Sequence, residues 1–262
     1  MKVYLIVILV WILSPVVFCQ QTDTINITDK NGKKQGHWIK RDEAGTIQYE
    51  GFFKDDKPVG EFKRYYEDGT IRSLMFHQED NPEVSAKFYH PNGFIAAEGS
   101  YINQKKEGVW KFFSLNTEGY RICEENYSND LRNGPSTKFY KNDIIAEKLT
   151  YVNDIRHGEW TQYYVTGNLC IKANYDNGKL NGSFEVLYAN GKPEYIGAYN
   201  NDVRDGPWKI FTEEGKLEIE LVYKMGSLDD PRVAERENAF LDLLEKNKGR
   251  ISDPEITGTI WK

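Results

Sequence analysis

Hydrophobic and aromatic residues recur along the chain with a period of about 24 residues. In the clearest copy, Gly158 is followed by Trp160, by the pair Tyr163 and Tyr164, and then by a second glycine, Gly167. One degenerate copy has Glu83 in the place of the first glycine, followed by Phe88 and Tyr89. The other seven copies begin at lead glycines that we expect to be structural: Gly36, Gly60, Gly108, Gly134, Gly158, Gly182 and Gly206. Eight copies at a nearly constant period predict a tandem-repeat architecture.

Each copy has the composition of one β-hairpin. In the clearest copy, residues 159–165 are rich in aromatic and β-forming residues, which favours a strand. Residues 166–168 form a turn in which Gly167 supplies the positive φ of a tight hairpin. Apolar residues alternate along 169–175, as expected for a second strand, and residues 176–181 lead to the next copy. Consecutive hairpins then form a meander in which every copy depends on its neighbours.

The repeats account for residues 31–224, after a polar leader at residues 20–30. The sequence therefore predicts an all-β fold, an elongated single-layer antiparallel meander of about eight tandem β-hairpin repeats. Residues 225–262 are predicted to form a C-terminal capping α-helix and a tail, because an acidic cap and Pro231 precede an apolar stripe at helical spacing. The helix would cover the last strand, which is otherwise unpaired. The alternative is that the stripe docks a partner.

Residues 1–19 have the pattern of a secretory signal peptide. Lys2 precedes the apolar run 3–13, and a polar segment follows Cys19. The run is shorter than a membrane-spanning helix requires, and Pro15 interrupts the segment that follows it. We therefore expect an exported protein, periplasmic, in the cell envelope or secreted, with no transmembrane span after cleavage. Lipid anchoring at Cys19 is the less favoured alternative, because the bulky Phe18 fits a lipoprotein signal poorly.

The charge of the chain narrows the range of partners. Its formal net charge is −6, and removal of residues 1–19, whose only charged side chain is Lys2, makes it −7. An acidic chain without a basic block argues against nucleic acid or an anionic membrane as the main partner.

The closing half of the repeat, with Tyr175, Asn177, Gly178, Lys179 and Gly182, resembles the MORN repeat and more closely its bacterial variant. The resemblance covers roughly residues 30–224. It implies an elongated, twisted antiparallel sheet with a non-catalytic role in interaction or assembly, and some bacterial members are labelled antitoxins. Three copies depart from the pattern: the third lacks its glycine, the fourth is lengthened around Asn116, and the fifth has Asp143 for its second glycine.

Residues that commonly act in catalysis or bind metal ions are present, but they do not have the spacings that such sites require. The four histidines, His37, His77, His90 and His157, form no zinc-binding spacing with one another or with cysteine. The sequence also has no nucleophile elbow and no phosphate-cradling loop. We therefore expect no enzymatic activity, no cofactor and no metal site.

Two sets of residues are candidates for a binding surface. Rows of rings along the sheet would form an aromatic ladder, or would only join strand to strand. These rings are Trp38, Phe62, Tyr65, Trp110, Trp160, Tyr163, Phe184 and Trp208. Basic residues near the second loops would line one edge of the sheet, unless Asp130, Asp154 and Asp202 beside them largely cancel their charge. This basic loop edge comprises Lys57, Lys105, Arg132, Arg156 and Arg204.

Three functions fit these features. The favoured one is an exported scaffold that binds another protein, with self-association as a further possibility. The second is a glycan-binding or cell-wall-binding module that stacks sugar rings on the aromatic ladder. The third, an antitoxin-like neutralising protein, rests on the family resemblance alone.

Overall fold

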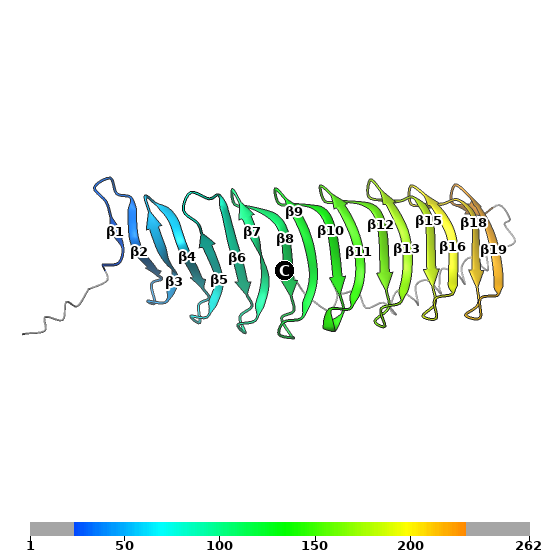
Figure 1. Ribbon diagram of the computed structural model, residues 1–262, viewed down its shortest axis with the longest axis horizontal. Helices are drawn as coiled ribbons and strands as arrows, with labels where there is room; N and C mark the ends of the chain where they lie inside the picture. The colour runs from blue at the N-terminus through cyan, green and yellow to red at the C-terminus, as the bar shows by residue number, and fades with distance from the viewer. Residues whose placement is uncertain (1–23, 229–262) are drawn as a thin grey trace, which may run out of the picture.

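The computed structural model describes residues 24–228, which form one elongated antiparallel sheet of 20 strands (Figure 1). Strands consecutive in the chain are neighbours in the sheet, so the topology is a meander. The predicted all-β, single-layer fold is confirmed. The predicted signal peptide and the C-terminal helix lie outside the described residues.

Sixteen of the strands contain six to nine residues and the other four contain two, and one 3₁₀ turn interrupts the series. Their bounds are β1 Ile27–Thr28, β2 Lys34–Arg41, β3 Ile47–Lys54, β4 Lys57–Tyr65, β5 Ile71–His77, β6 Glu83–Tyr89, β7 Ile95–Ile102, β8 Lys105–Phe113, β9 Arg121–Ser128, β10 Leu131–Phe139, η1 Lys141–Asp143, β11 Ile145–Val152, β12 Ile155–Tyr163, β13 Leu169–Asp176, β14 Lys179–Leu180, β15 Gly182–Leu187, β16 Pro193–Asn200, β17 Val203–Arg204, β18 Gly206–Phe211, β19 Leu217–Lys224 and β20 Ser227–Leu228.

Four lead glycines, Gly60, Gly108, Gly134 and Gly158, lie inside strands at β-bulges, and Gly182 and Gly206 begin strands β15 and β18. Gly158 has φ +77°. It lies in a bulge of β12: between two consecutive cross-strand pairs, β12 has two more residues than its neighbour β11. All seven lead glycines have positive φ, a region that side chains other than those of Asn and Asp rarely adopt. This backbone geometry differs from our expectation that the turns would account for these glycines.

The connections between hairpins are shorter than the six-residue loops that the sequence suggested. The chain turns at only two residues, such as Asn153 and Asp154, which both have positive φ. This geometry matches the twist of the flanking strands, and Asn, Asp and Gly tolerate it best. The predicted loop residues Arg132, Arg156 and Arg204 consequently lie in strands β10, β12 and β17.

The third hairpin corrects our alignment of the repeats by one residue. Val84 pairs with Tyr101 as Gly158 pairs with Tyr175, so Val84 holds the lead position and not Glu83. Valine does not adopt the positive φ of a lead glycine, and the β5–β6 ladder accordingly continues without a bulge.

Tyrosine hydrogen bonds with a constant spacing of 23 residues tie four of the hairpins to the next, all on the same side of the sheet. The hydroxyl of Tyr164, just after β12, donates to the carbonyl of Leu187 at the end of β15, at 2.7 Å. Tyr66, Tyr140 and Tyr188 make the same contact 23 residues ahead, to Tyr89, Tyr163 and Phe211. In these copies, the second residue of the aromatic pair therefore fixes the register of one repeat relative to the next.

On the opposite side of the sheet, where the two-residue turns lie, a second row of hydrogen bonds joins neighbouring hairpins. The Asp154 amide donates to the carbonyl of Arg132, and its carboxylate accepts from the Arg132 amide. Asp56, Asp130 and Asp202 make the same pair of bonds to Lys34, Lys106 and Leu180. These acids hold neighbouring hairpins together, which the interpretation as solvated turns did not anticipate.

At the N-terminal edge strand of the sheet, the side chain of Asn26 pairs with the backbone of β2. Asn26 has φ 61°, and its amide accepts from the backbone N–H of Ile39 at 2.8 Å and donates to the carbonyl of the same residue at 3.0 Å. The side chain thus takes the place of a peptide group in the ladder beyond the two residues of β1. It satisfies polar backbone groups that an open edge leaves unpaired.

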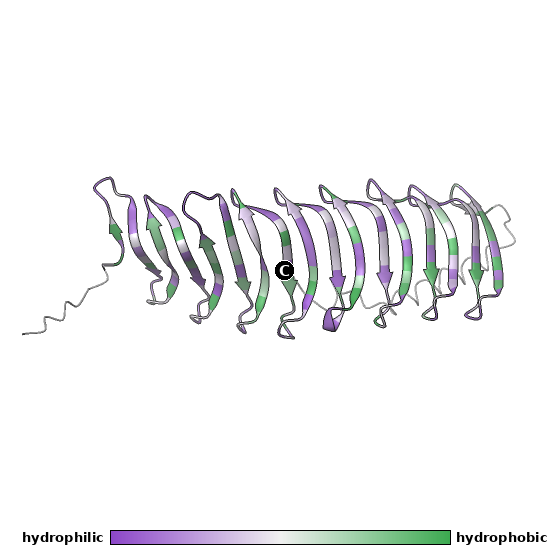
Figure 2. Ribbon diagram, viewed as in Figure 1, coloured by the Kyte–Doolittle hydropathy of each residue, from purple (hydrophilic) through white to green (hydrophobic). Residues whose placement is uncertain are grey.

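The two faces of the sheet differ in composition, and hydrophobic and hydrophilic segments alternate across it (Figure 2). We call the face that carries Trp110 and Trp208 the tryptophan face. It contains the buried hydrophobic clusters around these two rings and around Leu149. We call the opposite face, which carries Lys87, Glu98 and Lys111, the charged face.

Candidate binding surfaces

Two indoles of the tryptophan face lie flat on glycine. A Cβ added at Gly197 would lie 2.3 Å from the Trp208 ring, and one at Gly99 would lie 2.4 Å from the Trp110 ring. In this position the Nε1–H of Trp208 donates to the carbonyl of Ala198 at 3.2 Å. That of Trp110 donates to Ser100 at 3.1 Å. Both side chains are buried, with exposed fractions of 2% and 1%.

Trp110 and Trp208 occupy the same position in the first strand of their hairpins. The residue at this position is matched in size to the residue that it packs on in the preceding strand. In four hairpins, a large ring lies over glycine or an alanine lies over methionine. The pairs are Phe62 on Gly51, Ala86 on Met75, Trp110 on Gly99 and Trp208 on Gly197. In each of these pairs, the two residues together therefore fill the space between neighbouring hairpins.

Trp160 departs from this rule. Leu149, and not glycine, precedes it on β11, and the indole takes a different partner, with Nε1 3.2 Å from a carboxylate oxygen of Glu147. The ring remains half-buried, 5.6 Å from the ring of Tyr175. A branched side chain below the indole thus leaves it less deeply packed than Trp110 and Trp208.

These positions correct the predicted aromatic ladder. Trp110 and Trp208 are buried, so neither ring is open to stack on a ligand; Trp38, Phe62, Trp160 and Phe184 are half-buried. Tyr65 and Tyr163 lie on the opposite, charged face, where the Tyr65 hydroxyl donates to Glu50 at 2.5 Å. Burial and the neighbouring Glu50 both raise the pKa of Tyr65 above its ordinary value. The eight predicted rings therefore do not form one surface.

The predicted basic edge is also divided between the two faces. Arg132 and Arg204 fold over rings of the tryptophan face, 4.0 Å from the centroid of Tyr151 and 5.0 Å from that of Trp208. Arg156 lies over Tyr175 in the same way. Lys57 and Lys105 are exposed on the other side, because successive residues of a strand point to opposite faces. Lys34, which we had not included in this edge, and Lys106 both lie two residues before a lead glycine.

Lys106 shows how these cations contribute to the structure. Its ammonium lies 4.9 Å from the Trp110 ring centroid and 4.7 Å from that of Tyr127. Burial lowers the pKa of Lys106 below its ordinary value, and Glu125 and Asp130 oppose this shift. The cation–π contacts stabilise a partly desolvated charge over the rings.

The ion pair between Arg132 and Asp154 gives the protein a predictable response to acid. The Arg132 guanidinium lies 2.8 Å from the carboxylate and lowers the pKa of Asp154 below 3.8. Because the folded-state pKa is depressed, this contribution is present above pH 3.8 and is lost as the pH falls through the lowered pKa. The pair is partly exposed, so the contribution is under about 1 kcal/mol. In Arg132→Met, NMR titration should show the Asp154 midpoint rising towards 3.8; an unchanged midpoint would refute the assignment.

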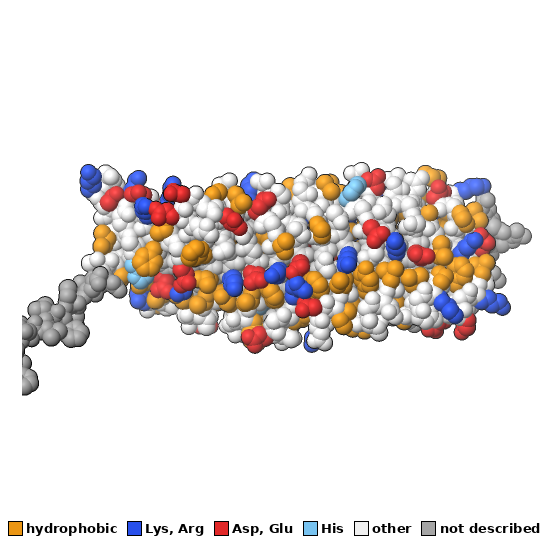
Figure 3. Space-filling model, in the orientation of Figure 1, with side chains coloured by type: hydrophobic (Ala, Val, Ile, Leu, Met, Phe, Trp, Pro, Cys, Tyr) orange, Lys and Arg blue, Asp and Glu red, His pale blue; other side chains and the backbone are white. Residues whose placement is uncertain are grey.

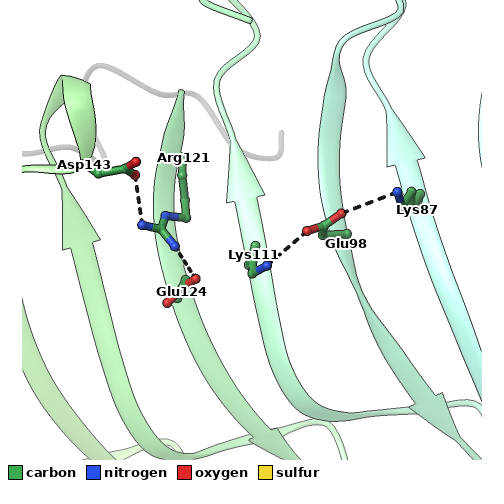
Figure 4. Close-up of polar contacts among 6 residues, drawn as sticks. All are labelled: Lys87, Glu98, Lys111, Arg121, Glu124 and Asp143. Atoms are coloured by element: carbon green, nitrogen blue, oxygen red, sulfur yellow. Dashed lines mark hydrogen bonds and ion pairs between the residues drawn. The ribbon is translucent and has the colours of Figure 1, made fainter. Parts of the chain in front are cut away.

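The charged face combines apolar and ionic side chains. On the long face shown in Figure 3, hydrophobic side chains form a band along the molecule, with lysine, arginine and acidic side chains among them. Phe52 and Phe76 are large apolar residues exposed on this face. Ionic contacts cross the strands here, as Figure 4 shows for Lys87, Glu98 and Lys111.

Residues 24–228 contain neither a cluster of metal ligands nor a membrane-spanning helix. No group of three or more His, Cys, Asp or Glu residues in this range is arranged to hold a metal ion. No helix in the same range is long and apolar enough to cross a membrane.

Comparison with known proteins identifies the repeat. The family model of the MORN repeat variant matches residues 34–55, 58–79, 82–103, 132–153, 156–177 and 204–225. These six segments together make up just over half of the chain. The third match begins two residues before Val84, as the others begin two residues before a lead glycine, which agrees with the corrected alignment. No curated protein matches the chain. The chain belongs to the MORN repeat variant family.

Proposed function

We propose that this chain is an exported, non-catalytic scaffold that binds another protein through the charged face of its sheet. MORN repeats generally serve as interaction scaffolds. The observation that carries the proposal is the exposure of large apolar side chains on an open face, at Phe52, Phe76 and Val109 on strands β3–β8 and at Val222 on β19. The first three lie within six neighbouring strands. Apolar side chains grouped on a surface and bordered by charges are typical of interaction sites.

The signal-like pattern of residues 1–19 supports export to the periplasm, the envelope or the medium. A glycan-binding role has less support, because Trp110 and Trp208 are buried. An antitoxin role rests on no observed site, and an adjacent toxin-like reading frame would be the first sign of one.

The test is a pull-down with the complete chain, tagged at its C-terminus and expressed in its native host so that any processing takes place. Retained proteins are identified by mass spectrometry, and retained glycan is assayed in parallel. A matched control carries Phe52→Ser, Phe76→Ser and Val222→Ser, polar substitutions like the Ser100 found at the equivalent position of β7. We expect one stoichiometric protein with the wild type and at least a tenfold lower yield with the control. Retention of polysaccharide without a protein, or equal yield from both chains, would refute the proposal.

A further inference from the structure

The charged face contains a shallow hollow of about 380 Å³ on strands β5–β8. Its floor is formed by small residues, Ser85 on β6 and Ser100 on β7. Phe76 on β5 and Val109 on β8 stand on its two sides, and each is 50% exposed. The hollow therefore has apolar walls that are open to solvent.

The repeat does not require these apolar walls. Among the other hairpins, the position of Val109 is held mostly by polar residues or proline, and that of Phe76 mostly by small or polar residues. The residues equivalent to Val109 include Glu61, Glu159, Ser183 and Pro207, and those equivalent to Phe76 include Ser100, Asn126, Thr150 and Asn174. Packing of the sheet is satisfied without large apolar groups at these two places.

The charges at the hollow are unequal. Lys87 and Lys111 share a single acid, because their ammonium groups lie 3.8 Å and 3.3 Å from the carboxylate of Glu98 (Figure 4). The next acid along the row, Glu124, is the cross-strand neighbour of Lys111 and contacts Arg121, which also contacts Asp143 at 2.9 Å. Two other lysines elsewhere on this face do not share an acid in this way.

Lys63 contacts two acids, Glu50 at 3.7 Å and Glu61 at 2.6 Å. Lys209 has Glu220 as its own partner, at 3.8 Å. The lysines at the hollow are also more exposed than the acid they share: Lys87 and Lys111 are 50% and 41% exposed, and Glu98 is 27% exposed. Among the residues that line the hollow, two lysines thus face one acid, so the lining carries a net charge of +1.

We propose that the hollow binds an extended segment of a protein partner, with an apolar side chain between Phe76 and Val109 and an adjacent carboxylate at Lys87 and Lys111. This inference rests on the proposed scaffold function and specifies its site. A hollow of this volume holds one or two side chains, and a single surplus cation suits one carboxylate. An anionic membrane would require a larger basic patch than one surplus charge on a chain of net charge −6.

The experiment selects peptides from a phage-displayed library of random 12-residue sequences on the immobilised full-length protein. We expect enrichment of sequences in which Asp or Glu lies within two residues of a Leu, Ile, Phe or Tyr. A fluorescent copy of the best peptide is then titrated with the variants. Ser85→Tyr fills the hollow and should weaken binding more than tenfold, whereas Ser183→Tyr, at the equivalent position four hairpins away, should not. Lys111→Gln should weaken binding about tenfold, and Lys209→Gln, its matched control, should leave it unchanged.

Several outcomes would overturn the assignment. They are a library that yields no enriched peptide, enriched peptides without the acidic residue, equal binding by Ser85→Tyr and Ser183→Tyr, and binding to vesicles of anionic phospholipid in place of peptide. If the native partner from the pull-down is retained equally by wild type and Ser85→Tyr, the hollow is wrong but the scaffold function stands. If no native protein is retained, the scaffold function itself fails.

Discussion

Replacing Trp208 by alanine is expected to lower the free energy of unfolding by about 3–5 kcal/mol, the usual cost of removing a large buried ring. The indole is 2% exposed and packs against Tyr199, Tyr223 and Phe184. Its loss also removes the hydrogen bond to Ala198. Because each hairpin is supported only by its neighbours, the damage should spread along the C-terminal part of the sheet. Urea unfolding followed by circular dichroism measures the change.

Trp160→Ala is the matched control for this prediction. Trp160 occupies the equivalent position, but it is half-buried above Leu149. Its removal should cost less than half as much. Equal losses in the two variants would show that flat packing on glycine does not distinguish the two indoles.

Gly197→Ala is expected to destabilise the protein by about 1–3 kcal/mol, the usual cost of overpacking. In an ordinary strand the same substitution is favourable by about 0.5–1 kcal/mol, because glycine weakens a strand interior. The sign is reversed here because the added Cβ would lie 2.3 Å from the Trp208 ring and would lift it. The free energy of unfolding in urea again provides the measurement.

A double-mutant cycle isolates the cause. Once Trp208 is alanine, the added methyl group meets no ring, so Gly197→Ala should cost nothing further in that background. The coupling between the two sites should be about 1–3 kcal/mol. Additive effects of the two substitutions would mean that the glycine is needed for a reason other than the ring above it.

The sequence was sufficient for the architecture because the period and the turn residues are local signals. Gly167, for example, was identified as a turn residue with positive φ, and it has φ +87°. The third hairpin shows where local signals fail. Without a lead glycine, Phe88 and Tyr89 matched the aromatic pair as well as Tyr89 and His90 do, and only cross-strand pairing distinguished the two alignments.

The candidate surfaces were harder to predict because they depend on which residues face each other across strands. Gly99 and Gly197 look like ordinary strand glycines until the register places an indole on each. Arg132 and Lys105 look alike in sequence, but they lie on opposite faces of the sheet. The hollow requires four neighbouring strands to be placed together, and no single repeat contains it.

The ties on the two sides of the sheet have a consequence for how proteins of this kind vary in length. Each tie joins a residue to one 22 to 24 positions away, so the hairpins that make these ties repeat the same connections forwards and backwards. A duplication or excision of one complete copy would preserve all of them, whereas loss of a single residue would invert the faces of a strand. Each whole copy lengthens the molecule by two strand spacings, about 9.5 Å. Partners bound at two points along the sheet can therefore be moved apart in steps of that size.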